Sequence, residues 1–248
     1  MKLDRVIAVR NNKTVYRDDD RAVKVFVSGT SKPDVINEAL NQSRMEETDL
    51  PVPAVLEVSV IDGKWSIVSD YISGKTLSQL IAEQPHRLCE YMDLFVKIHA
   101  RIHSTKCPSL PSLKEKMLRK FADSHLVSAE YDKKRRILCE MPDECSVCHG
   151  DFSLSNVIID ENGNPFIIDW SHASCGNKLA DIAKTYLLFI LKDEKDIAEL
   201  YLNKMCDTFS VDKSSIFKWI PLVATSEMSV SRGAKLQILR EFANLENK

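Results

Sequence analysis

The first seventy residues alternate between short apolar runs and turn-forming residues, a pattern that predicts strands with one helix among them. Residues 6–9 and 14–17 are strand-like and flank Asn11-Asn12, a pair that tolerates positive φ and predicts a hairpin. Residues 18–20 are all aspartate and predict a second turn, which leads into a strand over residues 22–27. The chain is therefore expected to begin as an antiparallel sheet.

A helix and a second hairpin complete this part. Ser31-Lys32-Pro33-Asp34 resembles a capping box and predicts a helix that runs to about Glu47. Two further strands, over residues 55–61 and 65–68, are joined at Asp62-Gly63, which is a strong hairpin signal.

After Gly74 the apolar spacing becomes helical. Helices are predicted over residues 76–83, 89–103, 113–125 and 130–141, and again from Leu179 to the end. Between them, residues 157–160 and 165–169 predict a hairpin. We therefore expect an α+β protein of two lobes: a small β-rich lobe with one helix over residues 1–72, and a larger helical lobe with an embedded hairpin over residues 73–248.

Composition and charge exclude several classes of function. The 248 residues include 34 Lys plus Arg and 36 Asp plus Glu, so the net charge of -2 does not call for a nucleic-acid or membrane partner. No apolar run approaches the length of a membrane span, and residues 1–5 lack the apolar segment of a signal peptide. No two glycines have the G-x-G spacing of a dinucleotide fold. We expect a cytoplasmic protein; the sequence does not indicate its oligomeric state.

The seven cysteines are scattered, and in a chain without a secretion signal they are expected to be reduced. Cys145-Ser146-Val147-Cys148-His149 matches the pattern of covalent haem attachment, but that chemistry requires export. A zinc site would need a second closely spaced ligand pair, which the sequence lacks. Neither group is therefore expected.

Two segments compete as phosphate sites. Residues 69–76 nearly spell a Walker A loop, in which Lys75 would bind phosphate. Ser69, however, stands where the loop needs its first glycine, and the preceding strand follows a hairpin rather than opening a parallel sheet. A P-loop NTPase is therefore the weaker alternative.

The stronger segment is His149-Gly150-Asp151 with Asn156, followed after the predicted hairpin by Asp169. Phosphoryl transfer depends on positioning and charge neutralisation. Asp151 is placed to take the proton of an acceptor hydroxyl. The side chains of Asn156 and Asp169 supply the hard oxygen ligands that Mg²⁺ prefers. Turns are rich in Asp and Asn in any case, but a strand lysine, Lys24, and a helical glutamate, Glu38, precede this motif in the order that a kinase requires.

Together these motifs resemble the protein-kinase-like superfamily and, more closely, the aminoglycoside phosphotransferase and choline kinase-like family. Residues 14–26, residues 50–77 and Gly176–Ala183 are similar to further segments of that family. The resemblance implies a bilobal protein-kinase-like fold. It also implies ATP (GTP is possible) as phosphoryl donor with Mg²⁺ as cofactor, and a small-molecule hydroxyl compound as acceptor.

The resemblance also assigns residues. Lys24 would contact the α- and β-phosphates and pair with Glu38. The backbone of Ser69 and Tyr71 would meet the adenine edge, with Val68 lining the pocket. In the catalytic lobe, His149 and Asp181 would give structural support to the loop of Asp151.

The sequence departs from the protein-kinase pattern in three places. No glycine-rich loop covers the phosphates, because residues 10–13 occupy that hairpin. Gly150 stands where a protein kinase has arginine, and eleven residues separate Asp169 from Asp181, too few for a peptide-binding activation segment. Protein kinase activity is therefore not expected.

We expect a kinase that phosphorylates a hydroxyl of an aminoglycoside, a sugar or an amino alcohol. Residues 73–248 contain equal numbers of basic and acidic residues, so their charge does not favour a polycation. Trp219, Glu227 and Arg232 lie where the family's last helices complete the acceptor site. The alternative is a non-catalytic nucleotide-binding protein of the same fold, although such a protein would not need Asp151.

Overall fold

The computed structural model describes residues 3, 5–10, 12–124 and 126–245, and this part of the chain forms two compact units. The first unit runs to Leu88 and includes Leu154–His172; the second comprises Cys89–Ser153 and the chain from Ala173 onward. Asn11 of the predicted first hairpin and His125 of a predicted helix lie outside the described residues.

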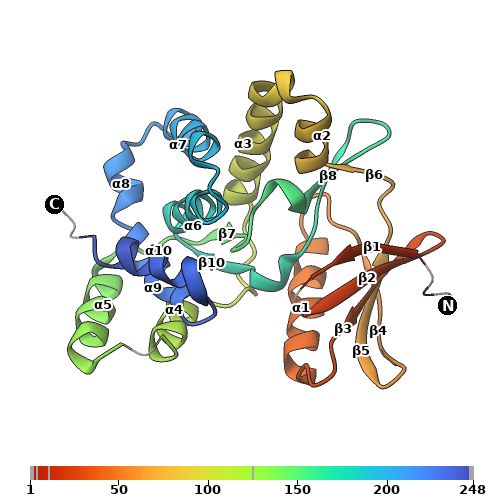
Figure 1. The fold of residues 1–248 in the computed structure, drawn as a ribbon, viewed down its shortest axis with the longest axis horizontal. Helices are drawn as coiled ribbons and strands as arrows, with labels where there is room; N and C mark the ends of the chain where they lie inside the picture. Colours follow the sequence, from red (N-terminus) through yellow and green to blue (C-terminus); the bar gives the residue numbers. More distant parts are fainter. Residues whose placement is uncertain (1–2, 4, 11, 125, 246–248) are drawn as a thin grey trace. The chain divides into compact units, whose positions relative to one another are not determined.

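The first unit is built on an antiparallel sheet with strand order β1-β2-β3-β5-β4 (Figure 1). Its strands are β1 (Arg5–Val9), β2 (Lys13–Asp18), β3 (Arg21–Phe26), β4 (Val55–Ile61) and β5 (Lys64–Asp70). Asp62 and Gly63 join β4 to β5 with φ of 48° and 74°, the left-handed conformations that the sharp hairpin turn requires. The strands predicted in this part of the sequence are all present.

Helix α1 (Lys32–Glu46) lies along one face of this sheet (Figure 1). Ser31 caps it, because its hydroxyl accepts a hydrogen bond from the Asp34 N–H. Val35 and Ala39 of α1 are buried against Phe26 and Ile67 of the sheet, which forms the apolar core of the unit. This core fixes the face of α1 that carries Glu38.

A smaller sheet of β6 (Gly74–Thr76), β8 (Val157–Asp160) and β9 (Pro165–Ile167) also belongs to the first unit. Gly74 is required here, because a Cβ atom at this position would lie 2.2 Å from the Ile159 carbonyl oxygen. The turns η2 (Leu154–Asn156) and η3 (Trp170–His172) flank the hairpin, and α2 (Leu77–Glu83) and η1 (Pro85–Arg87) follow β6.

These units differ from the predicted ranges 1–72 and 73–248. The β6–β8 pairing attaches the hairpin to the first unit, and the Ile167 N–H donates to the Pro51 carbonyl at 2.9 Å. Both contacts are long-range, so the local pattern did not reveal them.

The second unit is mainly helical. Its elements are α3 (Leu88–Ser104), α4 (Leu113–Ala122), α5 (Ser128–Glu140), β7 (Ser146–Cys148), β10 (Ser174–Gly176), α6 (Lys178–Ile190), α7 (Lys195–Phe209), α8 (Lys213–Phe217), α9 (Ile220–Met228) and α10 (Gly233–Ala243). Helix α9 packs against α4, α6 and α10 (Figure 1). Phe95 of α3 stacks on Phe152 with ring centroids 4.3 Å apart, which anchors the chain just after Asp151. Among the described residues, no helix is both long and apolar enough to cross a membrane.

The expectation that all the cysteines are reduced is wrong at one pair. Antiparallel pairing of β7 with β10 brings Cys145 and Cys175 together as a disulfide, with Cα atoms 5.2 Å apart. Cys148 is a free, buried thiol whose pKa is raised by burial. The Cys145–Cys148–His149 segment is therefore part of a strand and the loop that follows it.

Candidate active site

Lys24 and Glu38 form a buried ion pair in the first unit. The Lys24 Nζ, in the middle of β3, lies 2.8 Å from Glu38 Oε1 on α1. Burial alone would lower the pKa of Lys24, but the carboxylates of Glu38 and Asp169 outweigh it and the pKa is raised. The lysine therefore stays charged. The structure thus brings together two residues that were predicted to act together.

A second lysine, Lys13, joins this pair and was not predicted from the sequence. Its Nζ lies 2.8 Å from Glu38 Oε1 and 3.1 Å from Asp169 Oδ1, and only 5% of the residue is exposed. Strand register explains its place. Lys13 is two residues before Val15, which pairs with Lys24, so both lysines face the same side of the sheet.

Asp169 stands just beyond β9, which ends at Ile167, two residues earlier than the predicted strand. Its φ is 66°, a left-handed conformation that an aspartate adopts at a cost of about 1–3 kcal/mol and that is concentrated at functional sites. The Ile168 N–H donates to the Asn156 carbonyl at 3.0 Å, so the backbone holds these two segments side by side. Asn156 and Asp169 offer the oxygen donors that suit Mg²⁺.

These residues lie at a cavity of about 560 Å³ within the first unit, a size suited to a small ligand. Val15, Ala22, Ile158 and Ile168 make part of its wall apolar. Its charged and polar lining includes Lys13, Lys24, Asn156 and Asp169. The cavity therefore combines an apolar wall with a cluster of charges.

The predicted adenine-binding segment reaches this cavity in part. Ser69 and Tyr71 line it, whereas Val68 is fully buried and is not among the lining residues. Neighbouring strand residues face opposite sides of a sheet, so Ser69 and Val68 do not share a surface. The Tyr71 N–H donates to the Asp20 carbonyl at 2.8 Å, so in this structure it is engaged within the sheet.

The loop that was predicted to be catalytic, His149-Gly150-Asp151, lies in the second unit, where Asp181 holds its backbone. The two carboxylate oxygens of Asp181 accept the N–H groups of His149 and Gly150, each at 2.9 Å. Gly150 has a φ of 77°, which favours glycine at this turn. The Asp151 N–H donates to His149 Nδ1 at 3.2 Å. The N–H groups of three consecutive residues, His149, Gly150 and Asp151, are thus all hydrogen-bonded.

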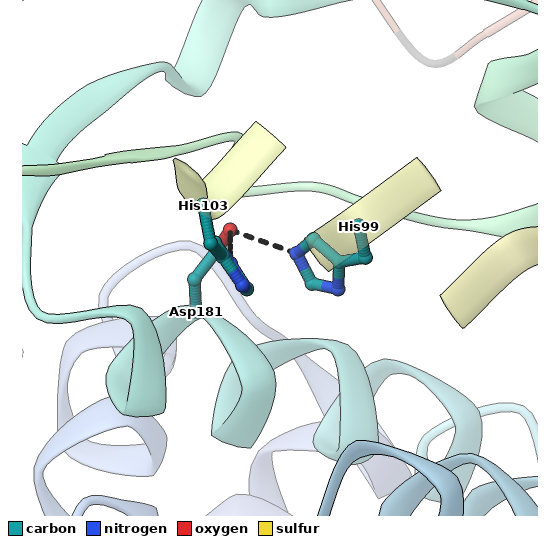
Figure 2. A group of neighbouring side chains, drawn as sticks. All are labelled: His99, His103 and Asp181. Atoms are coloured by element: carbon teal, nitrogen blue, oxygen red, sulfur yellow. Dashed lines mark hydrogen bonds and ion pairs between the residues drawn. The ribbon is translucent and has the colours of Figure 1, made fainter. Parts of the chain in front are cut away.

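Two histidines of α3, His99 and His103, also contact Asp181 (Figure 2). His99 Nε2 and His103 Nε2 lie 3.0 and 3.2 Å from Asp181 Oδ2, and the Tyr201 hydroxyl lies 2.8 Å from His99 Nδ1. Burial and the neighbouring His103 lower the pKa of His99 to about 3, so the ring is neutral. We assign its proton to Nε2, which donates to Asp181, while Nδ1 accepts from Tyr201.

The same three side chains have metal-ligand spacing, since their donor atoms lie within 4.8 Å of one another. A metal would need the lone pairs of the two Nε2 atoms. In the assigned arrangement the His99 Nε2 atom carries a proton directed at Asp181, and the His103 Nε2 atom lies within hydrogen-bond distance of the same carboxylate, which also accepts the two backbone N–H groups. Burial raises the pKa of Asp181, but the hydrogen bonds from His103 and His99 outweigh it and hold the pKa well below its usual value. Hydrogen bonding therefore accounts for the cluster.

A second group of charges lies on the helices of the second unit. Lys120 of α4 and Lys184 of α6 place their Nζ atoms 2.7 and 3.0 Å from Glu227 Oε1 on α9. Of the other acceptor-region residues named from the sequence, Trp219 is buried and Arg232 donates to the carbonyls of Ser229 and Ser231.

The Walker-like segment has a different structure from a P-loop. Strand β6 pairs antiparallel with β8, and Lys75 forms an exposed ion pair with Glu83 at 2.7 Å. A phosphate-binding loop requires a parallel strand and a curl of backbone N–H groups before a helix. The P-loop interpretation is therefore wrong.

A strand lysine paired with a helix glutamate, an aspartate after a hairpin, and a braced His-Gly-Asp loop are the parts of a phosphoryl-transfer site. A family model described as "Phosphotransferase enzyme family" matches residues 5–204, and the chain belongs to this family. A search of curated proteins by sequence found no match.

Solved structures of several phosphotransferases have a similar fold. A thermostable mutant of aminoglycoside phosphotransferase APH(4)-Ia, in a ternary complex with AMP-PNP and hygromycin B, has a TM-score of 0.70 at 15% identity, with 96% of this chain and 91% of that chain covered. Choline kinase LicA from Streptococcus pneumoniae has a TM-score of 0.61 at 18% identity, covering 97% and 91%. ADP-bound APH(2'')-Ib has a TM-score of 0.63 at 15% identity, with the same coverage. The predicted α+β protein-kinase-like fold and the family resemblance are confirmed.

Proposed function

We propose that this protein is a small-molecule kinase that transfers the γ-phosphoryl group of ATP to a hydroxyl group of its acceptor. The observation that carries the proposal is the cavity lined by Lys13, Lys24 and Asp169, which form one connected ion-pair cluster with the buried Glu38. Asp151, in the second unit, is separated from Asn156 by five positions of continuous chain.

The donor nucleotide would occupy the cavity of the first unit. Its adenine would pack on the apolar wall that includes Val15 and Ile168, near Ser69. The triphosphate would lie at Lys24 and Lys13, whose charges offset those of the phosphates. Glu38 holds both ammonium groups in place. Complexes of similar proteins with AMP-PNP and with ADP support a nucleotide at this site, with GTP as the alternative donor.

The side chains of Asn156 and Asp169 would hold Mg²⁺, which when bound would neutralise phosphate charge as the transfer proceeds. Their donor atoms fit this ion, because both are oxygens. The Lys13 ammonium group at Asp169 Oδ1 supports a cation-favouring environment at this carboxylate.

Asp151 would orient the acceptor hydroxyl and take its proton. The hydroxyl oxygen then forms a bond to the γ-phosphorus while the bond from that phosphorus to the ADP oxygen breaks. The products are a phosphate monoester and ADP, with the proton on the Asp151 carboxylate. Asp181 and the two histidines keep the loop in position for this step.

The experiment is a transfer assay with purified protein, Mg²⁺ and ATP against a panel of sugars, amino alcohols and aminoglycosides, with phosphate esters detected by mass spectrometry. Asp151→Asn should reduce turnover by roughly 10²–10⁴-fold, since a general base contributes about that much. Calorimetry with AMP-PNP should show unchanged nucleotide affinity in this variant. Transfer by the wild type with full activity in Asp151→Asn would refute the mechanism. Nucleotide binding without transfer to any acceptor would favour the non-catalytic alternative.

A further inference from the structure

Lys13 joins two carboxylates of the first unit to which the proposed function gives different tasks. Its Nζ atom lies 2.8 and 3.1 Å from the two oxygens of Glu38 and 3.1 Å from Asp169 Oδ1. Lys24, by contrast, has an ion pair with Glu38 alone among the described residues. Lys13 is therefore the lysine in direct contact with the proposed metal ligand.

This contact involves an oxygen atom that a metal ion would use. Asp169 Oδ1 accepts from the Lys13 ammonium group and, at 3.1 Å, from the Ser171 hydroxyl. A divalent cation bound at this oxygen would be repelled by an ammonium group so close to it. Only 5% of Lys13 is exposed, so solvent screens this repulsion little. In its present position, Lys13 therefore opposes the binding of a metal ion on its own.

The cavity of the first unit offers the ammonium group another partner. Lys13, Lys24 and Asp169 line this cavity of about 560 Å³. A lysine carries its charge on a flexible four-carbon chain, so Nζ can exchange one partner for another while β2 stays in place. The sequence has no glycine-rich loop to cover phosphates, and Lys13 belongs to residues 10–13, which occupy that hairpin. Phosphate oxygens bound in the cavity would thus compete with Asp169 for this lysine.

We propose that Lys13 couples the binding of the metal ion to that of the nucleotide: its ammonium group opposes a divalent cation at Asp169, and it moves to the phosphates when the nucleotide binds. The proposal rests on the proposed function and concerns the regulation of the same site. Removal of the charge should therefore strengthen binding of the metal ion alone and weaken binding of the nucleotide. A lysine that only stabilised the fold would not change the two affinities in opposite directions.

Two titrations of Lys13→Met beside the wild type test both effects. Methionine keeps an unbranched apolar chain at this buried position, and Glu38 keeps its ion pair with Lys24. Mn²⁺, which prefers the same oxygen ligands as Mg²⁺, is titrated without nucleotide, and the unbound ion is followed by electron paramagnetic resonance. AMP-PNP is titrated by calorimetry at saturating Mg²⁺. We expect the variant to bind Mn²⁺ roughly 10- to 100-fold more tightly and AMP-PNP roughly 10- to 100-fold more weakly, the range that one charge-assisted hydrogen bond spans.

Four further variants separate charge from packing. Lys13→Gln removes the same charge with a shorter side chain and should reproduce both changes, whereas Lys13→Arg keeps the charge and should bind Mn²⁺ as weakly as the wild type. Lys24→Met should weaken AMP-PNP binding but strengthen Mn²⁺ binding less than Lys13→Met does, because its ion pair is with Glu38. Lys64→Met, the same change at an exposed position of β5, should alter neither affinity.

The proposal is overturned if Lys13→Met and Lys13→Gln leave the Mn²⁺ affinity unchanged or lower it, or if both leave the AMP-PNP affinity unchanged. Failure of the proposed function would look different, since AMP-PNP would not bind to the wild type or transfer would persist in Asp151→Asn. The Mn²⁺ titration needs no nucleotide and therefore tests the contact of Lys13 with Asp169 separately.

Discussion

Replacing Asp181 with asparagine tests how the loop that carries Asp151 is held. The aspartate accepts hydrogen bonds from His99, His103, His149 and Gly150, spread over its two oxygens. Asparagine has nearly the same shape but offers one oxygen and one NH₂ group. If its oxygen takes the position of Oδ2, the NH₂ group faces the Gly150 N–H, and two donors meet in a buried place.

The size of the effect follows from these contacts. A hydrogen bond to a charged group stabilises by about 1.5–3 kcal/mol and a neutral one by about 1 kcal/mol, while an orphaned buried donor costs about 1–3 kcal/mol. Three weakened bonds and one orphaned N–H therefore cost several kcal/mol. Removing a buried charge recovers part of this, because desolvation of an ion is itself costly. We expect a net loss of about 2–4 kcal/mol in the free energy of unfolding.

The loss is measured by urea unfolding of Asp181→Asn beside wild type, with Asp132→Asn, at an exposed position of α5, as the matched control. A chain of this length should unfold roughly 5–15 °C lower in a thermal scan. Turnover should fall further than nucleotide affinity, because the loop of Asp151 lies in the second unit and the cavity proposed for the nucleotide lies in the first. A free energy of unfolding within about 0.5 kcal/mol of the wild-type value would show that the hydrogen bonds to Asp181 do not hold the loop.

Three further predictions concern other parts of the chain. Lys75→Ala should leave AMP-PNP affinity unchanged, since its ion pair is exposed, whereas Lys24→Ala should weaken it strongly; calorimetry on both variants decides, and the reverse pattern would contradict the site. Gly74→Ala should cost about 1–3 kcal/mol in urea unfolding, because its Cβ would collide with the Ile159 carbonyl, and an unchanged midpoint would contradict that geometry. The folded-state pKa of His99 is depressed to about 3 from 6.5, so below pH 6.5 the unfolded state takes up a proton that the folded state does not. Stability should therefore fall more steeply from pH 6.5 to pH 5 in wild type than in His99→Gln, as pH-dependent unfolding would show; parallel curves would refute the assignment.

Local signals explain how much of the fold could be predicted from the sequence. The hairpin at Asp62-Gly63 and the cap at Ser31 depend on residues close together in the chain, and both are present. The pairing of Lys24 with Glu38 was expected from the family resemblance and is also present. Each of these features needs only a short pattern or a recognised motif.

The features that were missed depend on long-range contacts. The burial of Lys13 follows from the β2–β3 register and from Asp169, which is distant in sequence. The pairing of β6 with β8 moves the hairpin into the first unit, and the pairing of β7 with β10 joins Cys145 to Cys175. None of these pairings leaves a periodic signal in either partner alone. The ion pairs of Lys120 and Lys184 with Glu227 likewise require α4, α6 and α9 to pack together.

The ion-pair cluster of the first unit balances its own charge. Lys13 and Lys24 are matched by Glu38 and Asp169, so the cluster is close to neutral as it stands. In the proposed function a nucleotide enters together with Mg²⁺, and the charges of these two ligands offset one another. A cluster that is already close to neutral is therefore the arrangement expected for that pair of ligands.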